Sequence, residues 1–477
     1  METLLKPDHK YIEVADRIEK LIEKQTLKVG DKLLSVRSLS KQQGISLSTS
    51  FQAYYYLESK GLIEARPQSG YYVKFSPRHS FEIPTCSEPT DEALPISVDE
   101  MISSVYHDLR SPNLLSFSLS APHPSLLPSA KLNKSVVHSL RHSPDHCLGY
   151  EHIQGNEELR KQIAKLSLNW GGALSEDDLV ITAGCMEALS FCLRATTKPG
   201  DAVATESPTF YGIFRVMQSL GLKVVEVPTD PVTGVDIDYL EQAITRFDIK
   251  ACLFVPNFNN PIGSCVPDEK KKQLVELLAK KEIPLIEDDI YGEMYFGKTR
   301  PRTCKTYDKK GLVLHCGSFS KSLAPGYRIG WTAAGRYKNK VIQLKRMHNI
   351  STNTLAQVSI AHFLQNGRYE LHLRRLRKDL HTQCLRYLQA ITEFFPENIR
   401  ISQPQGGFVL WIEMKKGDGY KLHKRALKNQ IGIAPGQIFS AQGQFQNYFR
   451  LSYGLPWSDQ IEKGLTTLGE LMYKEMT

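Results

Sequence analysis

The chain has 477 residues, of which 41% are hydrophobic and 23% are charged, and its formal net charge is +9. Single cores stop growing at roughly 250–300 residues, so a chain of this length excludes a one-core protein and predicts two folded units. No run approaches the ~18 apolar residues of a membrane span, which excludes a membrane helix, and the positive charge favours an anionic partner.

The N-terminus and the cysteines both favour the cytoplasm. The first ten residues, METLLKPDHK, carry proline and charges where a secretory signal peptide needs an apolar stretch. The nine cysteines include no C-x-x-C pair and no Cys/His cluster at metal-ligand spacing. We therefore expect reduced thiols, no disulfide, no metal site and a cytoplasmic localisation.

Residues 1–75 are predicted to form an α+β winged helix-turn-helix. Residues 11–25 show the alternation of apolar and charged faces that is typical of a short amphipathic helix. Two more helical patterns, SVRSLSKQQG and SLSTSFQAYYYLESKG, each end in a glycine that suits a helix C-cap. The segment LIEARPQSGYYVKF then indicates two strands joined by a Pro/Gly turn.

This N-terminal segment lacks acidic residues where a DNA groove would lie. Residues 32–57 contain no Asp or Glu, and residues 1–78 hold 13 Lys and Arg against 9 Asp and Glu. Such a distribution is the electrostatic signature of nucleic-acid binding; the alternative is a helix whose Ser, Tyr and Gln merely face solvent. We predict that operator DNA is contacted by the second and third helices and by the wing, through Arg37, Ser46, Ser48, Thr49, Gln52, Arg66 and Gly70.

The segment resembles the GntR-type winged helix, whose pattern appears here as LLSVRSLSKQQGIS and AYYYLESKGLIEARPQSGYYV. Two positions depart from that family. Leu34 stands where proline is usual, and Leu47 stands where arginine is frequent. The resemblance implies DNA binding, but the second departure weakens a phosphate contact or alters the site that is read, so no operator sequence is carried over.

A linker and an α/β domain are predicted after the winged helix. Residues 76–112 are rich in Pro, Ser and acidic residues and read as a linker with one helix near residues 97–110. From residue 113 to 477, apolar runs such as LVITAG, ACLFVPN and IPLIEDD alternate with helical segments. This alternation is typical of a parallel sheet covered by helices, and we expect a smaller α/β subdomain beside it.

The motif SFSKSLAPGYRIGW, residues 318–331, has the composition of a Schiff-base site. A Schiff-base lysine must be partly deprotonated, and neighbouring cations together with exclusion of water lower its pKa, so Lys321 is placed for this chemistry. Arg328 can bind a phosphate with its guanidinium fork, and Ser318 and Ser320 add hydroxyl donors to the same anion. A lysine on a solvated face is the alternative, and the rest of the motif argues against it.

Three upstream motifs carry polar or aromatic residues at predicted strand ends, where open α/β sheets bind ligands. They are LIEDDIYG with Asp288 and Tyr291, PNFNNPIG with Asn260, and ESPTFYG with Phe210. Taken singly, Asp288 could cap a helix, Asn260 could make a turn and Phe210 could belong to the core. The occurrence of all the motifs in this order favours one cofactor site.

From about residue 113 to its end the chain resembles fold-type I aminotransferases, and with its GntR-like head it looks like the MocR type of regulator. This resemblance implies pyridoxal 5'-phosphate (PLP) bound to Lys321. It also implies that Asp288 pairs with the pyridine nitrogen and keeps the ring an electron sink. Tyr291 and Asn260 would bind the ring phenolate oxygen, and Phe210 would stack on the ring.

The resemblance implies a phosphate-binding turn in ITAGCMEALS, where backbone N–H groups at a helix N-terminus would hold the anion. Its residues are Gly184, Cys185 and Met186. Cys185 replaces a small residue and Met186 a polar one, often Gln. We expect the loss of one side-chain hydrogen bond, worth about 1 kcal/mol of cofactor affinity.

Two further positions concern the effector and a second subunit. Arg450, in NYFRLSYG, stands where such proteins bind the α-carboxylate of an amino acid, and Asn260 is expected in the same substrate site. Tyr150 stands where a tyrosine reaches the phosphate of the neighbouring subunit. If this correspondence holds, each site is shared and the protein is a homodimer.

Three functions fit the sequence. In the first, a transcription regulator, PLP alone or with an amino-acid-like or amine effector changes how a homodimer presents its heads to operator DNA. In the second, an aminotransferase, Lys321 shuttles the proton, Asp288 supports the electron sink and Arg450 holds the carboxylate. In the third, the large domain is a dimerisation scaffold without cofactor. The attached, acid-free head favours the first, because a plain enzyme has no use for it.

Overall fold

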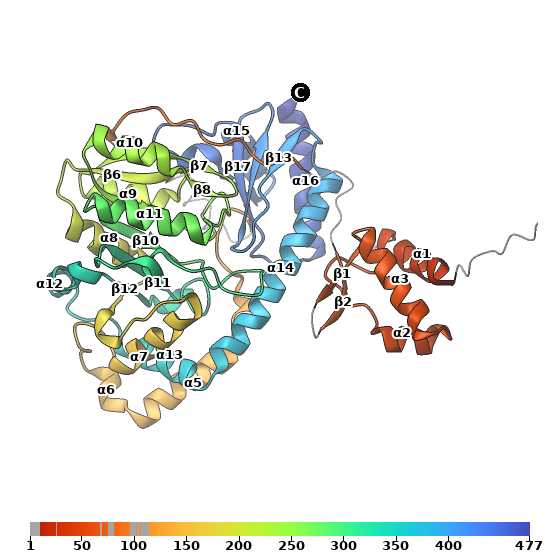
Figure 1. Cartoon of the computed structure of the whole chain (residues 1–477), viewed down its shortest axis with the longest axis horizontal. Helices are drawn as coiled ribbons and strands as arrows, with labels where there is room; N and C mark the ends of the chain where they lie inside the picture. Colours follow the sequence, from red (N-terminus) through yellow and green to blue (C-terminus); the bar gives the residue numbers. More distant parts are fainter. Residues whose placement is uncertain are drawn as a thin grey trace, which may run out of the picture. The chain divides into compact units, whose positions relative to one another are not determined.

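The computed structural model describes residues 10–24, 26–66, 69–74, 81–95, 102, 105 and 114–477. The chain divides into two compact units. One comprises Met1–Phe81, His381–Glu397 and Trp457–Glu470, and the other comprises Glu82–Leu380, Asn398–Pro456 and Leu471–Thr477. Figure 1 labels the helices and strands of both units.

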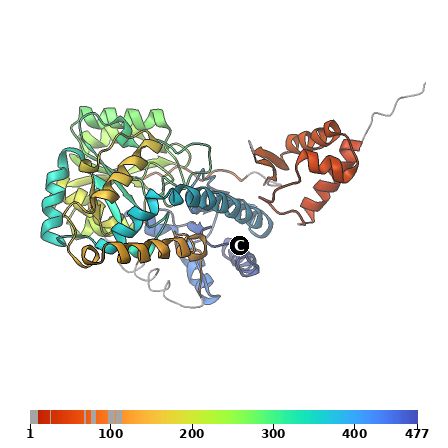
Figure 2. The same ribbon diagram turned by 90° about the horizontal axis from the view of Figure 1, so that it is seen from below.

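Residues 10–74, here called the head, form three helices and a hairpin, which confirms the predicted order. The elements are α1 (Lys10–Glu23), α2 (Val36–Gln43), α3 (Leu47–Ser59), β1 (Ile63–Arg66) and β2 (Gly70–Val73). The two strands are antiparallel, and the apolar faces of the helices pack on them around Ala15, Leu39, Ala53, Leu57 and Ile63. Figure 2 shows the three helices of the head packed against one another.

The larger unit is built on a mixed sheet with strand order β3-β7-β6-β9-β10-β11-β12-β5, and β8 pairs with β7. The strands are β3 (Leu94–Pro95), β5 (Val180–Thr182), β6 (Ala202–Ser207), β7 (Lys223–Asp230), β8 (Gly234–Val235), β9 (Ile249–Phe254), β10 (Leu285–Asp288), β11 (Val313–Ser318) and β12 (Gly330–Ala333). Strands β7, β6, β9, β10 and β11 run parallel, whereas β12 runs antiparallel to both of its neighbours. The parallel strands therefore share one carboxyl edge, where ligands of such sheets bind.

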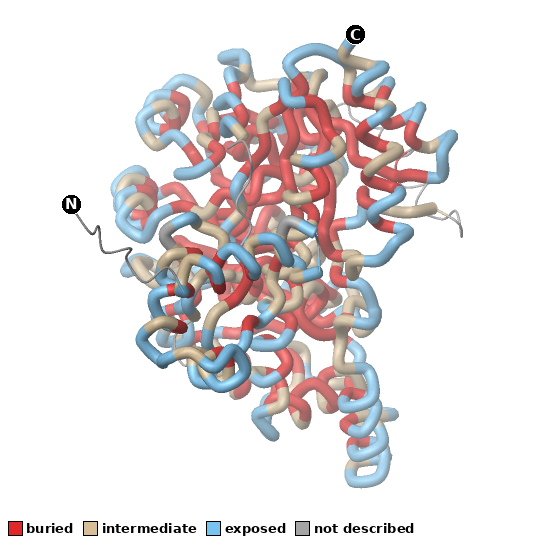
Figure 3. Tube along the Cα trace, turned by 90° about the vertical axis from the view of Figure 1, so that its right-hand side faces the viewer, coloured by how far each residue is buried: buried red, intermediate tan, exposed pale blue. Residues whose placement is uncertain are grey.

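Both faces of this sheet are buried. Val203 and Leu253 belong to one hydrophobic cluster, whereas Ala204 and Phe254, the next residues along the same strands, belong to another. Successive side chains of a strand point to opposite faces, so the two clusters are the two sides of the sheet. Figure 3 shows buried segments in the interior of the larger unit and exposed segments mainly at its surface.

The helices of the C-terminal part have the following bounds: α5 (Ser129–His142), α6 (Pro144–Leu148), α7 (Glu157–Ser167), α8 (Cys185–Thr196), α9 (Tyr211–Ser219), α10 (Ile237–Phe247), α11 (Asp268–Lys280), α12 (Lys338–His348), α13 (Thr354–Gln365), α14 (Arg368–Phe394), α15 (Gly419–Lys428) and α16 (Asp459–Met476). The predicted smaller subdomain is also present. Its antiparallel sheet has the order β13 (Ile399–Ile401), β14 (Val409–Met414), β17 (Tyr448–Ser452) and β16 (Ala434–Pro435). Next to it, β4 (Leu115–Ser116) pairs in parallel with β15 (Ile431–Gly432).

Residues 82–95, here called the strap, are folded onto the larger unit although they fall in the predicted linker. The Thr85 backbone N–H donates to the Glu413 carboxylate at 2.9 Å, and the Ser87 hydroxyl donates to the Ser207 carbonyl at 2.6 Å. Strand β3 extends the large sheet by pairing with β7. The helix predicted near residues 97–110 lies outside the described residues, apart from residues 102 and 105.

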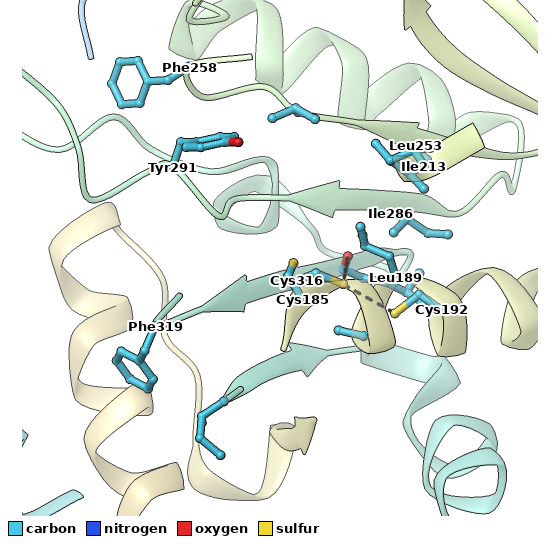
Figure 4. Packing of buried hydrophobic residues seen from close by; sticks show 14 of the residues in the cluster. Cys185, Leu189, Cys192, Ile213, Leu253, Phe258, Ile286, Tyr291, Cys316 and Phe319 are labelled. Atoms are coloured by element: carbon cyan, nitrogen blue, oxygen red, sulfur yellow. Dashed lines mark hydrogen bonds between the residues drawn. The ribbon is translucent and has the colours of Figure 1, made fainter. Parts of the chain in front are cut away.

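All nine cysteines are free thiols; Cys86 is exposed and six are buried. Cys192 Sγ lies 3.6 Å from Cys316 Sγ, in the packing between α8 and β11 (Figure 4). Among the described residues, no helix combines the length and the hydrophobicity that crossing a bilayer requires. Within the same ranges, no cluster of three or more His, Cys, Asp or Glu is arranged to hold a metal ion.

Candidate functional site

A cavity of about 220 Å³ lies at the carboxyl edge of the large sheet. It collects side chains from the ends of β9, β10 and β11, from the start of α8 and from β17 of the smaller subdomain. Most of the predicted site residues line it: Cys185, Met186, Phe210, Asn260, Asp288, Tyr291, Ser320, Lys321, Arg328 and Arg450. Residues far apart in the sequence therefore converge on one cavity.

Lys321 is half-buried in this cavity, just after β11. Its Nζ donates a hydrogen bond to the carbonyl oxygen of Ser120. Burial, together with the positive charges of Arg450 and Arg328, lowers the pKa of Lys321 to about 8, although Asp288 acts in the opposite direction. A lysine of this kind supplies neutral amine near physiological pH, as the sequence predicts.

Asp288 ends β10 and is buried at the floor of the cavity. Its Oδ1 accepts from the Ile290 backbone N–H at 3.2 Å and from the Cys185 thiol at 3.3 Å. Burial raises the pKa of Asp288 to about 6, while these two hydrogen bonds lower it. The thiol of Cys185 is thus directed at Asp288, and only the backbone of this residue remains for the predicted phosphate contact.

Arg450, Asn260 and Tyr291 form a hydrogen-bonded series across the cavity. Arg450 Nη1 donates to Asn260 Oδ1 at 2.8 Å, and Asn260 Nδ2 donates to Tyr291 Oη at 3.1 Å. Arg450 also donates from Nη2 to the carbonyl oxygen of Ser118. Burial raises the pKa of Tyr291, so this side chain stays a neutral phenol. Asn260 therefore links Arg450, the predicted ligand of a carboxylate, to Tyr291, the predicted partner of the ring oxygen.

The predicted phosphate-binding residues lie at the N-terminus of α8 and in the loop after β11. Gly184 adopts φ +89°, and a Cβ at this position would clash with the guanidinium of Arg328. Arg328 Nη1 lies 3.2 Å from Ser320 Oγ, and Ser318 Oγ lies 2.8 Å from Ser320 Oγ. A guanidinium, two hydroxyls and a helix N-terminus form a donor set that fits a phosphate. With Lys321 and Asp288, the set fits PLP.

Apolar side chains line the rest of the cavity: Leu119, Met186, Phe210, Tyr211, Val255 and Ile290. The ring of Phe210 lies 4.6 Å from that of Tyr211, centroid to centroid. Flat apolar walls with a few converging polar groups are typical of cofactor sites. Ser118 and Ser120 were not predicted as site residues, because they contact Arg450 and Lys321 through backbone carbonyls, which carry no residue-type signal.

Tyr150 is not among the residues that line the cavity, and 86% of its surface is exposed. It follows α6, next to Gly149, the C-cap residue of that helix. Its predicted contact with the phosphate of a second subunit stays a prediction.

The head residues predicted to contact DNA fall into two groups. Arg37, Ser48 and Gln52 are exposed on α2 and α3, and Gly70 is exposed at the start of β2. The other three residues have structural partners.

Ser46 caps α3: its Oγ accepts from the Thr49 N–H at 3.0 Å and lies 2.8 Å from Thr49 Oγ1. Arg66 stacks 4.3 Å over the ring of Tyr72 and pairs with Glu64 at 2.6 Å. A Ser or Thr at a helix start fits both a helix cap and a DNA contact, so the sequence could not separate the two groups.

Residues 10–73 match the model of the bacterial regulatory proteins, gntR family, and residues 119–468 match that of aminotransferase class I and II. Two relatives from Escherichia coli (strain K12) span the whole chain. The uncharacterized HTH-type transcriptional regulator YjiR is 38% identical, covering 98% of this chain and 99% of its own length. The uncharacterized HTH-type transcriptional regulator YdcR is 37% identical, covering 98% and 100%.

A solved structure matches the C-terminal part. LysN, the α-aminoadipate aminotransferase of Thermus thermophilus complexed with N-(5'-phosphopyridoxyl)-L-leucine, has a TM-score of 0.73 and 26% identity. The similarity covers 79% of this chain and 95% of that one.

Proposed function

The chain belongs to the GntR family of transcriptional regulators, in the MocR type that joins a winged helix to a PLP-dependent aminotransferase domain, and on this premise we propose that an amino-acid-like effector, bound beside PLP, controls its attachment to DNA. The observation that supports an amino-acid-like effector is the buried guanidinium of Arg450, which lines the same cavity as Lys321. A buried guanidinium beside a cofactor lysine suits a carboxylate ligand.

The cofactor site uses the polar groups of the cavity. PLP, when bound, supplies an electron sink for negative charge at the α-carbon of an amino acid. Lys321 would hold it covalently, since its pKa of about 8 keeps neutral amine available. Asp288, oriented by Cys185 and Ile290, would pair with the pyridine nitrogen. Arg328, Ser318 and Ser320 would bind the phosphate, together with the backbone of the turn that holds Gly184, Cys185 and Met186.

The effector site lies on the other side of the cavity. Arg450 would bind the α-carboxylate of the effector. Asn260 and Tyr291, which are hydrogen-bonded to Arg450 in series, would link this contact to the ring oxygen of the cofactor. In the structure described above, the carbonyl of Ser118 accepts from Arg450, so an arriving carboxylate competes with this backbone group. Ser118 follows β4, downstream of the linker that leads from the head. We infer that effector binding would release Ser118 from Arg450 and so free a segment that the linker joins to the DNA-binding head.

We propose that the protein acts in the cytoplasm as a homodimer. Four exposed residues of α5 and of the segment after it, 46% to 88% accessible, are large and mostly apolar: Val137, Leu140, Leu148 and Tyr150. Exposed large apolar side chains suit an interaction site, and a second copy that covers them would receive Tyr150 at the phosphate of its own cofactor. Two heads per assembly would then match the two half-sites of an operator.

Aminotransferase activity is the second candidate, and the completeness of the cavity favours it. Lys321, Asp288, Tyr291 and Arg450 are all in place, so exchange of an amino group between an amino acid and a 2-oxo acid is chemically available. The head has no function in such a reaction, which is why regulation is the primary proposal.

A gel-shift titration of PLP-loaded protein on its own upstream DNA, at fixed salt, tests the proposal. Amino acids and amines are added singly, and turnover to keto acids is measured in parallel. We expect specific binding that one class of amino compound strengthens or weakens. Non-specific binding together with enzyme-like turnover would instead establish the aminotransferase. The variant Arg450→Lys should lose the response to amino acids while it retains PLP, because lysine cannot form the bidentate fork.

A further inference from the structure

Helix α3 of the head presents three large apolar side chains to solvent. The exposed fractions are 53% for Leu47, 54% for Phe51 and 66% for Tyr55. They are four residues apart, so they lie in line along one face of the helix. The buried face of the helix carries Ser50, Ala53, Tyr54 and Leu57, and the last three belong to the hydrophobic core of the head.

The neighbouring strip of the helix surface carries exposed polar side chains. Ser48 and Gln52 are exposed and lie one residue, or about 100°, around the helix from Leu47 and Phe51. A single exposed leucine needs no explanation, but a row of three beside two hydrogen-bonding side chains is a surface of mixed chemistry. Such a surface suits a ligand that offers polar and apolar groups side by side.

The charges around the row indicate a polyanion. Lys32, Arg37 and Lys41 are exposed, and no acidic residue occurs between Asp31 and Glu58. The first turn of α3 has no acidic residue, so the positive end of its dipole is uncompensated. These features fit the phosphates of a DNA groove on either side of the helix.

Within the major groove, the only apolar group on a base edge is the 5-methyl of thymine. We infer that Leu47 and Phe51 read thymine methyl groups of the operator, beside the polar contacts of Ser48 and Gln52. Recognition helices approach base edges with their N-terminal residues, which places Leu47 and Phe51 at the bases and Tyr55 nearer the backbone. The departure at Leu47 from the arginine of related heads then replaces a polar contact with a methyl contact. The inference rests on the proposed DNA-binding function.

The test uses full-length PLP-loaded protein and the duplex protected in a footprint of its upstream DNA. Each thymine in the footprint is replaced in turn by uracil, which removes only the methyl group. We expect uracil at one or more positions to weaken binding about fourfold per methyl, the effect of one buried carbon. Phe51→Ala or Leu47→Ala should bind the thymine duplex less tightly and no longer distinguish it from the uracil duplex.

Lys41→Ala is the matched control, because an exposed cation that contacts phosphate should weaken both duplexes equally and reduce the salt dependence. Wild-type binding that is equal on all thymine and uracil duplexes would overturn the inference, as would a Phe51→Ala protein that still discriminates. A change in oligomeric mass of Phe51→Ala without DNA would also overturn it, since the row would then contact another copy. Absence of any footprint would instead refute the proposed function itself.

Discussion

Two lysines of this protein, the half-buried Lys321 and the buried Lys345, have similar pKa values but different surroundings. Burial lowers the pKa of both Lys321 and Lys345 to about 8. Lys345 Nζ donates to the Ile181 carbonyl at 2.6 Å and is not among the residues that line the cavity. A lowered pKa is therefore not specific to a cofactor lysine, and the neighbouring Asp288 and Arg328 are what support Lys321 as the proposed cofactor lysine.

Lys321→Ala should abolish the absorption band of bound PLP near the visible edge, because Lys321 is the only lysine among the described residues that line the cavity. The measurement is the spectrum of purified protein after incubation with PLP and gel filtration. Lys345→Met is the control and should retain the band, since Thr352 Oγ1 also contacts the Ile181 carbonyl, at 3.5 Å. A band in Lys321→Ala that resists gel filtration would contradict the assignment.

The rate at which apoprotein acquires this band should follow the pKa of Lys321. Its value is lowered from 10.5 to about 8, so the neutral, reactive amine dominates above pH 8 and falls about tenfold per pH unit below it. Stopped-flow absorbance with excess PLP should show a rate that rises up to pH 8 and then levels off. A rate that continues to rise to pH 10, as for a free lysine amine measured alongside, would show that the side chain is not shielded.

The residues of the site were predictable because each motif carries its chemistry locally, as Arg328 and Lys321 do seven residues apart. The pairing of Cys185 with Asp288 was not predictable. These two residues are 103 positions apart, and their contact exists only because α8 begins beside the end of β10.

At the scale of single elements, two nearby serines at the start of α3 have different roles: Ser46 stabilises the helix, and Ser48 is a predicted DNA contact. Ser46 closes the helix start through its bonds to Thr49, whereas Ser48 is exposed on the outer face. Removal of an N-cap typically costs about 1 kcal/mol, because an orphan backbone N–H loses its acceptor.

Ser46→Ala should accelerate hydrogen exchange of the α3 amides about fivefold, the equivalent of about 1 kcal/mol. Ser48→Ala should leave exchange unchanged and weaken operator binding. Mass spectrometry of exchanged peptides and gel shifts measure the two effects on the same preparations. If Ser48→Ala instead destabilised α3, the assignment of capping to Ser46 and DNA contact to Ser48 would be wrong.

Element boundaries were predicted to within a few residues where an amphipathic period was strong, as for α1, expected over 11–25 and observed over Lys10–Glu23. The strap was not predicted. Its position depends on Glu413 and on strand β7, which are distant in sequence, and its own composition resembles that of a linker. Long-range pairing of this kind leaves no local pattern.

At the scale of the whole molecule, the proposed homodimer predicts that each cofactor site uses two chains. Tyr150→Ala should weaken the affinity for PLP, although Lys321 is still present to bind it. Co-expression of Tyr150→Ala with Lys321→Ala should restore tight sites, because a mixed dimer joins an intact Lys321 to an intact Tyr150. Titration with PLP measures the number of tight sites. If the mixture behaves as the sum of its parents, the sites are not shared.

The burial of the thiols also has a practical consequence. Only Cys86 among the nine cysteines is exposed; Cys147 and Cys265 are half-buried and the other six are buried, among them Cys185, which lines the cavity. An alkylating reagent should thus modify Cys86 first, the two half-buried thiols more slowly, and the six buried thiols only when the core opens. A ligand that binds only the native state suppresses opening in proportion to its occupancy. The rate of the slowest alkylation phase should therefore report how far the protein is saturated with PLP and effector.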